Sequence, residues 1–272
     1  MKIDLLLDPF ETSWSELVEV ALAAESLGFD GLWTWDHLAG EVHGANRVLE
    51  SWTVLCAIAA RTSRVTIGPL VLNVGNRRPG VLAVMAATLQ EVSDGRLMLG
   101  LGAGGGLNTP YHREQLALGA EVPDDPRRRQ QVLDTIRICR EVWTGTTRPM
   151  ALANEQLSAG DGFLSPVPRP PIIVGGFGAR MAELAGSAAD GFNTQAGHPR
   201  LAELVSIARS AHQGRPGDFE ISGFASLEPR WVEEAEDRLD RLIMIVSPRS
   251  GTVALTDFAT AVGLSSASSS AP

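Results

Sequence analysis

Asp36 and His37 stand side by side directly after an apolar run at residues 31–35. An imidazole titrates near neutral pH and can give or take a proton, and a neighbouring carboxylate can orient it. The pair indicates general acid/base chemistry, with His37 as the acid/base and Asp36 as the residue that orients it. The structural alternative is an aspartate that caps a turn beside a histidine that bonds a loop carbonyl.

A glycine-rich segment follows another apolar run at residues 97–101. Gly100, Gly102 and Gly105 satisfy the spacing GxGxxG, but a dinucleotide site also needs a helix that begins there. The sequence continues instead with Asn108-Thr109-Pro110. The segment therefore favours a flat ligand that lies against bare backbone, with a flexible loop as the alternative.

A second glycine segment, Gly175-Gly176-Phe177-Gly178, joins a short apolar run to a helix that begins near Ala179. Free backbone amides at the start of a helix bind phosphate well. Arg180 could add positive charge to the same place. This segment predicts a phosphate site, and a tight strand–helix turn is the alternative. The run Arg127-Arg128-Arg129 favours a solvated helix face, although it could also meet an anionic cofactor or a partner subunit.

Short apolar runs alternate with longer amphipathic ones along the chain, which is typical of strand–helix units around a parallel sheet. The expected strands are residues 3–8, 31–35, 65–73, 97–101, 172–174, 191–194, 219–225 and 242–246. The expected helices are residues 17–27, 51–61, 79–92, 124–143, 179–188, 199–213, 231–239 and 252–262. Eight units predict an α/β fold with a single-domain (β/α)8 TIM barrel over residues 1–264, and a doubly wound open sheet is the alternative. The Ser/Ala-rich residues 265–272 are expected to be disordered.

Composition excludes several functions. The formal net charge is −9, with no basic stretch of the kind that nucleic acid requires. Lys2 is the one lysine among 23 Lys and Arg residues, so Schiff-base chemistry is not expected. Two cysteines without CxxC spacing, and scattered histidines, predict neither a disulfide framework nor a metal site. We expect a cytoplasmic protein without a signal peptide or membrane span.

Several stretches agree in order and spacing with one family over residues 3–265. They are residues 21–25, 28–33, 35–38, 57–62, 65–68, 78–79, 82–83, 93–97, 99–102, 175–178 and 189–192. In these stretches the sequence resembles the bacterial luciferase-like flavin and deazaflavin oxidoreductases. The resemblance implies a (β/α)8 barrel, a homodimer, and an isoalloxazine-like ring across the barrel mouth. It also implies that the ring's phosphate lies at the amides of residues 176–179, and that a non-proline cis peptide occurs near residues 70–73.

The Asp36-His37 pair resembles the branch that uses the deazaflavin coenzyme F420. The resemblance implies these cofactor-binding residues: Asp36, Leu72, Asn73, Gly104, Gly105, Gly175, Gly176, Phe177, Gly178 and Ala179. Candidate substrate contacts are Tyr111, Asn193 and Thr194. Three positions depart from the branch, because a Glu, a Trp and a Lys are expected where this chain has Gly105, Glu41 and His198. These departures argue against a glucose-6-phosphate dehydrogenase.

The sequence thus favours an F420-dependent oxidoreductase that transfers a hydride between deazaflavin and a small organic substrate. An FMN-dependent monooxygenase of the same fold is the main alternative. A cofactor-binding protein without turnover is a third hypothesis. A metal-dependent barrel hydrolase would apply only outside this family.

Overall fold

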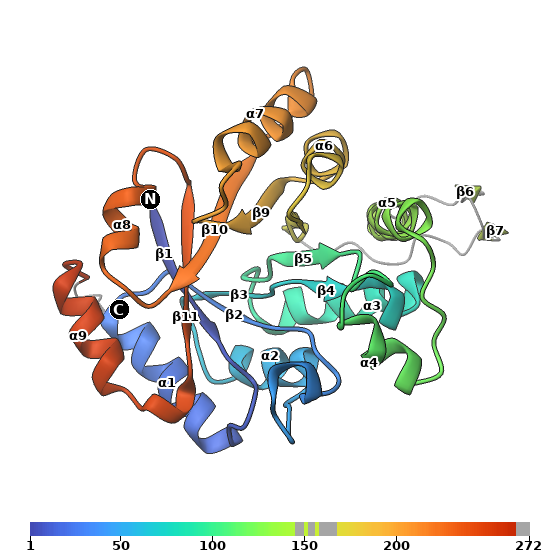
Figure 1. Ribbon diagram of the computed structural model, residues 1–272. Coiled ribbons are helices and arrows are strands. Elements are labelled where there is room, and N and C mark those ends of the chain that lie inside the picture. Colours follow the sequence, from blue (N-terminus) through green and yellow to red (C-terminus); the bar gives the residue numbers. More distant parts are fainter. Residues whose placement is uncertain (145–149, 152–155, 158–167, 265–272) are drawn as a thin grey trace.

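A closed parallel barrel is the centre of the molecule (Figure 1). The computed structural model describes residues 1–144, 150–151, 156–157 and 168–264. The sheet order is β3-β2-β1-β11-β10-β9-β8-β5-β4. Its strands are β1 (Lys2–Leu7), β2 (Gly31–Thr34), β3 (Thr66–Pro69), β4 (Leu72–Asn73), β5 (Leu99–Gly102), β8 (Ile172–Gly175), β9 (Gly191–Gln195), β10 (Glu220–Ser226) and β11 (Arg241–Val246). The predicted barrel is confirmed.

The third strand of the barrel consists of two pieces. β3 pairs with β2, and β4 pairs with β5, so the two pieces together close the ring. Sequence analysis predicts one strand over residues 65–73, but the structure interrupts it at a cis peptide bond between Leu70 and Val71. The position of this bond agrees with the place that the family resemblance implies.

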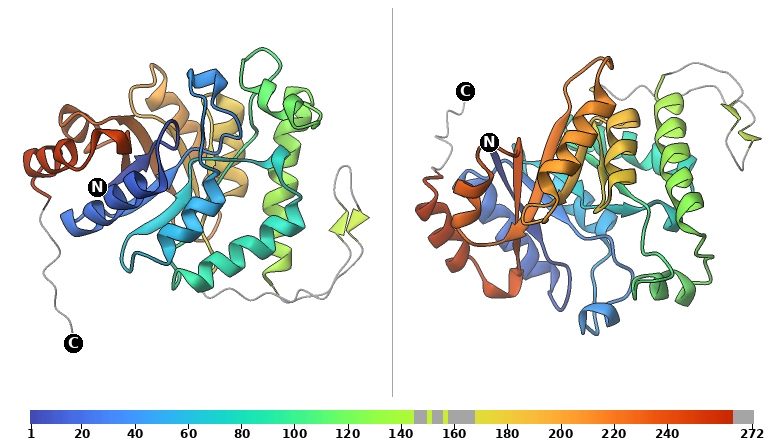
Figure 2. Two further views of the ribbon diagram at one scale, coloured as in Figure 1. Left: turned by 90° about the horizontal axis from the view of Figure 1, so that it is seen from below. Right: turned by 45° about the horizontal axis from the view of Figure 1, so that its top comes forward.

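Helices cover the outside of the barrel (Figure 2). They are α1 (Trp14–Leu27), α2 (Ser51–Ala59), α3 (Pro79–Val92), α4 (His112–Ala117), α5 (Asp125–Val142), α6 (Ala179–Ala188), α7 (Leu201–His212), α8 (Arg230–Ala235) and α9 (Val253–Ala261). Three short 3₁₀ turns are η1 (Glu41–His43), η2 (Val74–Asn76) and η3 (Pro248–Ser250). The α3 and α6 bounds match the predicted ranges, α8 is shorter than predicted, and α4 was not predicted. Among the described residues, no helix has the length and apolar character needed to cross a membrane.

Two short strands, β6 (Met150–Ala151) and β7 (Gln156–Leu157), pair with each other and lie outside the barrel, beyond α5 (Figures 1 and 2). The remaining residues between 145 and 167 lie outside the described part of the chain, as does the predicted disordered tail at 265–272.

Local sequence signals account for the placement of the first unit. Ser13 and Glu16 form the predicted capping box at the start of α1, each satisfying a backbone amide of the other. Gly28 ends the helix with φ 94°, a left-handed conformation that favours glycine. These signals fix where β2 begins, and therefore where Asp36 and His37 leave it.

The barrel interior is filled by side chains from alternate strand positions. One buried cluster lies inside the ring and comprises Leu6, Trp33, Leu70, Met98, Ile173 and Ile243. A larger cluster fills the layer between strands and helices. The interior cluster closes the barrel beneath its carboxyl-end mouth, so any ligand site must lie above it.

Below this cluster, at the amino ends of the strands, a buried ion pair joins the neighbouring strands β1, β11 and β10. Arg241 bonds Asp4, and its Nε donates to Glu220 Oε1 at 2.8 Å. Trp33 Nε1 also donates to Asp4 Oδ2 at 2.6 Å. Burial raises the pKa of Asp4, against the lowering effect of Arg241. The cluster is therefore a structural ion pair on the opposite side of the barrel core from the mouth.

Arg241→Met is expected to destabilise the fold by about 3–5 kcal/mol at neutral pH, because it leaves the Asp4 carboxylate buried without its cation. The loss should grow as pH rises, since a carboxyl group with a raised folded-state pKa loses stability when it ionises. The matched control is Lys2→Met, since the Lys2 ammonium lies 3.8 Å from Glu220 and its side chain is 56% exposed. It should cost less than about 1 kcal/mol. Urea unfolding of both variants checks this, and equal losses would contradict it.

Candidate functional site

A cavity of about 800 Å³ opens at the carboxyl ends of the strands. Most of the predicted site residues line it. They are Asp36, His37, Asn73, Gly104, Gly105, Tyr111, Gly175, Gly176, Phe177, Gly178, Ala179 and Asn193. Leu72 and Thr194 do not line the cavity, and both are fully buried. These two residues are therefore placed in the packing around the site, because they lie on the opposite face of their strands from the cavity residues Asn73 and Asn193.

His37 is held by a carboxylate that sequence analysis missed. Its Nδ1 lies 2.6 Å from Oε1 of Glu114, a residue of α4. The second oxygen of Glu114 accepts the amide of Leu38 at 3.0 Å. Burial alone would raise the pKa of Glu114, but the hydrogen bonds from His37 and Leu38 outweigh burial and lower it. Because an ionised carboxylate can only accept hydrogen bonds, His37 donates from Nδ1 and keeps Nε2 for the cavity side.

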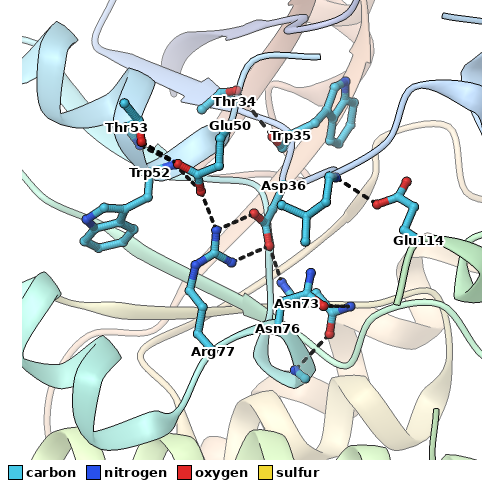
Figure 3. Close-up of polar contacts among 12 residues, drawn as sticks. Thr34, Trp35, Asp36, Glu50, Trp52, Thr53, Asn73, Asn76, Arg77 and Glu114 are labelled. Atoms are coloured by element: carbon cyan, nitrogen blue, oxygen red, sulfur yellow. Dashed lines mark hydrogen bonds and ion pairs between the residues drawn. The ribbon is translucent and has the colours of Figure 1, made fainter. Parts of the chain in front are cut away.

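Asp36 faces away from His37, which corrects the predicted orienting role. Its two oxygens accept a paired hydrogen bond from Arg77, each at 2.8 Å (Figure 3). Oδ2 also accepts a hydrogen bond from the backbone N–H of Asn73 at 2.8 Å. Arg77 also donates a hydrogen bond to Glu50 at 2.6 Å, and Glu50 caps the start of α2. The Asp36 side chain is thus engaged with Asn73 of β4 and with Arg77 between η2 and α3, and Glu114 is the residue that orients His37.

The glycines of the loop after β5 make room for neighbouring parts of the chain. A Cβ at Gly102 would lie 2.4 Å from the Val71 side chain. One at Gly104 would lie 2.4 Å from the side-chain amide of Asn73. At Gly105 it would lie 2.4 Å from Cβ of Tyr111. The glutamate that the family resemblance implies at this position therefore has no space here. α4 packs against the glycine instead and supplies its own carboxylate, Glu114.

The start of α6 is open toward the cavity. Its N-cap is Gly178, which makes no side-chain capping bond, and a Cβ there would meet nothing within 4 Å. The amides of the first helical turn have no carbonyl one turn earlier to bond. Arg180 of the same turn lines the cavity. One of the amides predicted to hold a phosphate, that of Gly176, donates instead to the Asn193 carbonyl at 3.0 Å, which corrects the predicted set. The amides of residues 177–179, with the nearby cation, are the groups that an anion site needs.

The three arginines at residues 127–129 of α5 have different contacts. Arg128 donates to the carbonyls of Ala103 and Gly104 at 3.0 and 2.5 Å, which fastens the glycine loop. Arg129 lines the cavity, whereas Arg127 faces a separate hollow beside α3. The hydrogen bond and charge of Arg128 lower the pKa of Asp125, with smaller contributions from Arg129 and Arg180. Positive potential is therefore local to the α5–α6 side of the cavity.

A sequence profile described as "Luciferase-like monooxygenase" matches residues 4–261. The chain belongs to this family. Two curated relatives, from Microbacterium testaceum and Gordonia bronchialis, are both 34% identical, over 184 and 213 residues. The matches cover 67% and 75% of this chain and 53% and 61% of the relatives. Both carry the name F420-dependent glucose-6-phosphate dehydrogenase. The chain spans about half the length of the first curated relatives that it matches.

Solved structures of two oxidoreductases have the same fold. An F420-dependent secondary alcohol dehydrogenase, solved with an F420–acetone adduct, superposes with a TM-score of 0.79 at 20% identity, covering 96% of this chain and 98% of that one. A monooxygenase from Streptomyces bottropensis superposes with a TM-score of 0.64 at 23% identity, covering 97% and 82%. Both superpositions show that the chain has the same barrel fold as these two enzymes.

The residues that sequence analysis missed share a cause. Glu114 lies on a helix of six residues, too short for a periodic signal. His43 lies on η1, where its Nε2 approaches His37 Nε2 to 3.3 Å. Arg77 precedes the helix-opening Pro79, and its role depends on a pairing with distant Asp36.

Within the described residues, no group of three or more His, Cys, Asp and Glu side chains could hold a metal.

Glu114→Gln should lower stability near neutral pH and lose this effect in acid. A carboxyl group whose folded-state pKa is lowered contributes stability above its unfolded pKa, and loses it as pH falls through the folded value. The difference in unfolding free energy between the wild type and this variant should therefore shrink as the pH falls below 4.5, the ordinary value for glutamate. Denaturant titrations at several pH values measure it, with the exposed Glu41→Gln as control. A difference that stays constant with pH would show that the carboxylate is not held by His37 and Leu38.

Proposed function

We propose that this protein is an F420-dependent oxidoreductase that transfers a hydride between the deazaflavin and a small, uncharged alcohol or carbonyl compound. The observation that carries the proposal is the arrangement of one cavity. The His37–Glu114 pair lies on its β2 side, and the open amides and arginines of an anion site lie on its α5–α6 side. The names of the curated relatives support the choice of cofactor.

The anionic end of F420 fits the start of α6. The amides of residues 177–180, with Arg129 and Arg180, would hold its phosphate by hydrogen bonds and charge. Neither arginine has an ion-pair partner among the described residues, so both are available to a ligand. Nε of Arg128 is also buried without a hydrogen-bond partner in the described structure. The chain has no lysine for this task, and the geometry supplies backbone amides and arginine in its place.

The flat part of the cofactor fits the floor of the cavity. Val71 lines it and is bordered by Gly102 and Gly175, where a Cβ would lie 2.4 and 2.8 Å from the valine side chain. Leu70 lines the same floor. This floor offers an apolar face and bare backbone, which suit a planar ring. When bound, the deazaflavin accepts or donates the hydride.

The residues on the β2 side handle the proton. Glu114 holds His37 with Nδ1 protonated, so Nε2 is the nitrogen that takes a proton from a substrate hydroxyl or returns it. The negative charge of Glu114 stabilises the imidazolium that results. His37 therefore acts as the acid/base, and Glu114 is its positioning residue.

The substrate side of the cavity is aromatic. The rings of Trp35 and Phe224 meet edge to face at 5.4 Å between centroids, and Phe177 approaches Phe224 at 6.2 Å. The described cations that line the cavity, Arg128, Arg129 and Arg180, all come from α5 and α6. A second phosphate would find no matching charge at the aromatic wall. The proposed substrate is therefore not a sugar phosphate, in contrast to the names of the relatives.

Titration of the protein with F420 and FMN side by side tests the cofactor. Binding of F420 should quench its fluorescence and be at least about tenfold tighter than binding of FMN, or about 1.4 kcal/mol. Arg129→Ala should weaken F420 binding by about tenfold, whereas Arg127→Ala, two residues earlier on the same helix, should leave it unchanged. Tight FMN binding with oxygen consumption that depends on reduced FMN would replace the proposal by a monooxygenase.

A further inference from the structure

A second imidazole reaches the proposed acid/base from the solvent side. His43 lies on η1, is exposed, and its Nε2 lies 3.3 Å from Nε2 of His37. The two rings meet edge to face at 4.6 Å between centroids, and Phe10 stacks on His43 at 4.3 Å. Both ring nitrogens of His37 are thus engaged, Nδ1 with Glu114 and Nε2 with His43.

A hydrogen bond between the two Nε2 atoms requires that only one of them carries a proton. With His37 Nδ1 donating to Glu114 and His43 protonated on Nδ1, one further proton between the two Nε2 atoms gives a single positive charge, which the Glu114 carboxylate balances. A second proton there would make both rings imidazolium and point two N–H groups at each other across 3.3 Å. Partial burial and the charge of His37 lower the pKa of His43, against the opposing charges of Glu114 and Asp8. Tyr111 borders both rings at 5.8 Å between centroids.

We propose that His43 is a proton shuttle that carries the reaction proton between His37 Nε2 and bulk water. This inference rests on the proposed acid/base role of His37. In alcohol oxidation, with bound deazaflavin as the hydride acceptor, the hydroxyl proton of the substrate would move to His37 Nε2 as the carbonyl product forms. After product release, His43 bonds Nε2, takes the proton on its own Nε2, and releases a proton to water from Nδ1. In the reverse direction the same path supplies the proton.

The shuttle role explains why His43 bonds His37 Nε2, the same nitrogen that the substrate hydroxyl would use. A substrate hydroxyl and His43 compete for His37 Nε2, so the shuttle contacts the acid/base only between turnovers. Glu114 fixes the His37 ring throughout, and the exposed loop that carries His43 supplies the group that moves.

Proton exchange between His37 and water, measured by nitrogen-15 NMR on the full chain without added ligand, tests the shuttle. In His43→Gln the exchange at His37 should slow by roughly tenfold or more, because an amide cannot take up and release the proton. Added imidazole buffer should restore the rate. His43→Phe should slow it as well, although a phenyl ring keeps the stacking with Phe10. His212→Gln changes a half-buried histidine of α7 that lies outside the cavity; it is the matched control and should leave the exchange at His37 unchanged.

Faster or unchanged exchange at His37 in the His43 variants would overturn the proposal, because faster exchange is the result expected if His43 only shields His37 from water. A failure of imidazole to restore the rate would also overturn it. The measurement needs no cofactor, so it is independent of the F420 titration. His43→Gln should bind F420 as the wild type does, and a protein that binds no F420 but shows the exchange effect would refute the cofactor and keep the shuttle.

Discussion

The paired hydrogen bond between Asp36 and Arg77 is the interaction on which the mouth of the barrel depends. It joins the end of β2 to the segment after β4, and Arg77 extends the link to Glu50 at the start of α2. Asp36 is buried and also accepts the Asn73 amide. Loss of one partner from such a buried pair costs about 3–5 kcal/mol. Because His37 is the next residue in the chain, the link that holds Asp36 also fixes the backbone that carries the proposed acid/base.

Two strand ends and one short helix then build the site around this link. The glycines after β5 let Val71, Asn73 and Tyr111 approach closely, so α4 can bring Glu114 to His37. A glutamate at the position of Gly105 would block that approach. Family membership thus accounts for the barrel, whereas the carboxylate beside the histidine comes from the short helix α4 of this chain.

Sequence patterns predicted the elements whose signals are local. Alternating apolar runs predicted the barrel, the capping box and Gly28 marked the ends of α1, and Gly178 marked the open start of α6. The contacts inside the site could not be predicted, because they join residues far apart in the chain. Asp36 and Arg77 are 41 residues apart, and His37 and Glu114 are 77 apart. A carboxylate next to a histidine in sequence indicated a pair, and the folded chain gave each of them a different partner.

A crystal structure of the protein with bound F420 tests the central claim most directly, that one cavity holds the cofactor between the α6 amides and His37. The account predicts the phosphate within hydrogen-bond distance of the amides of residues 177–180. It also predicts the ring against Val71, with its hydride-carrying carbon facing the His37 side. A phosphate bound away from α6, or a ring that does not face His37, would contradict the account.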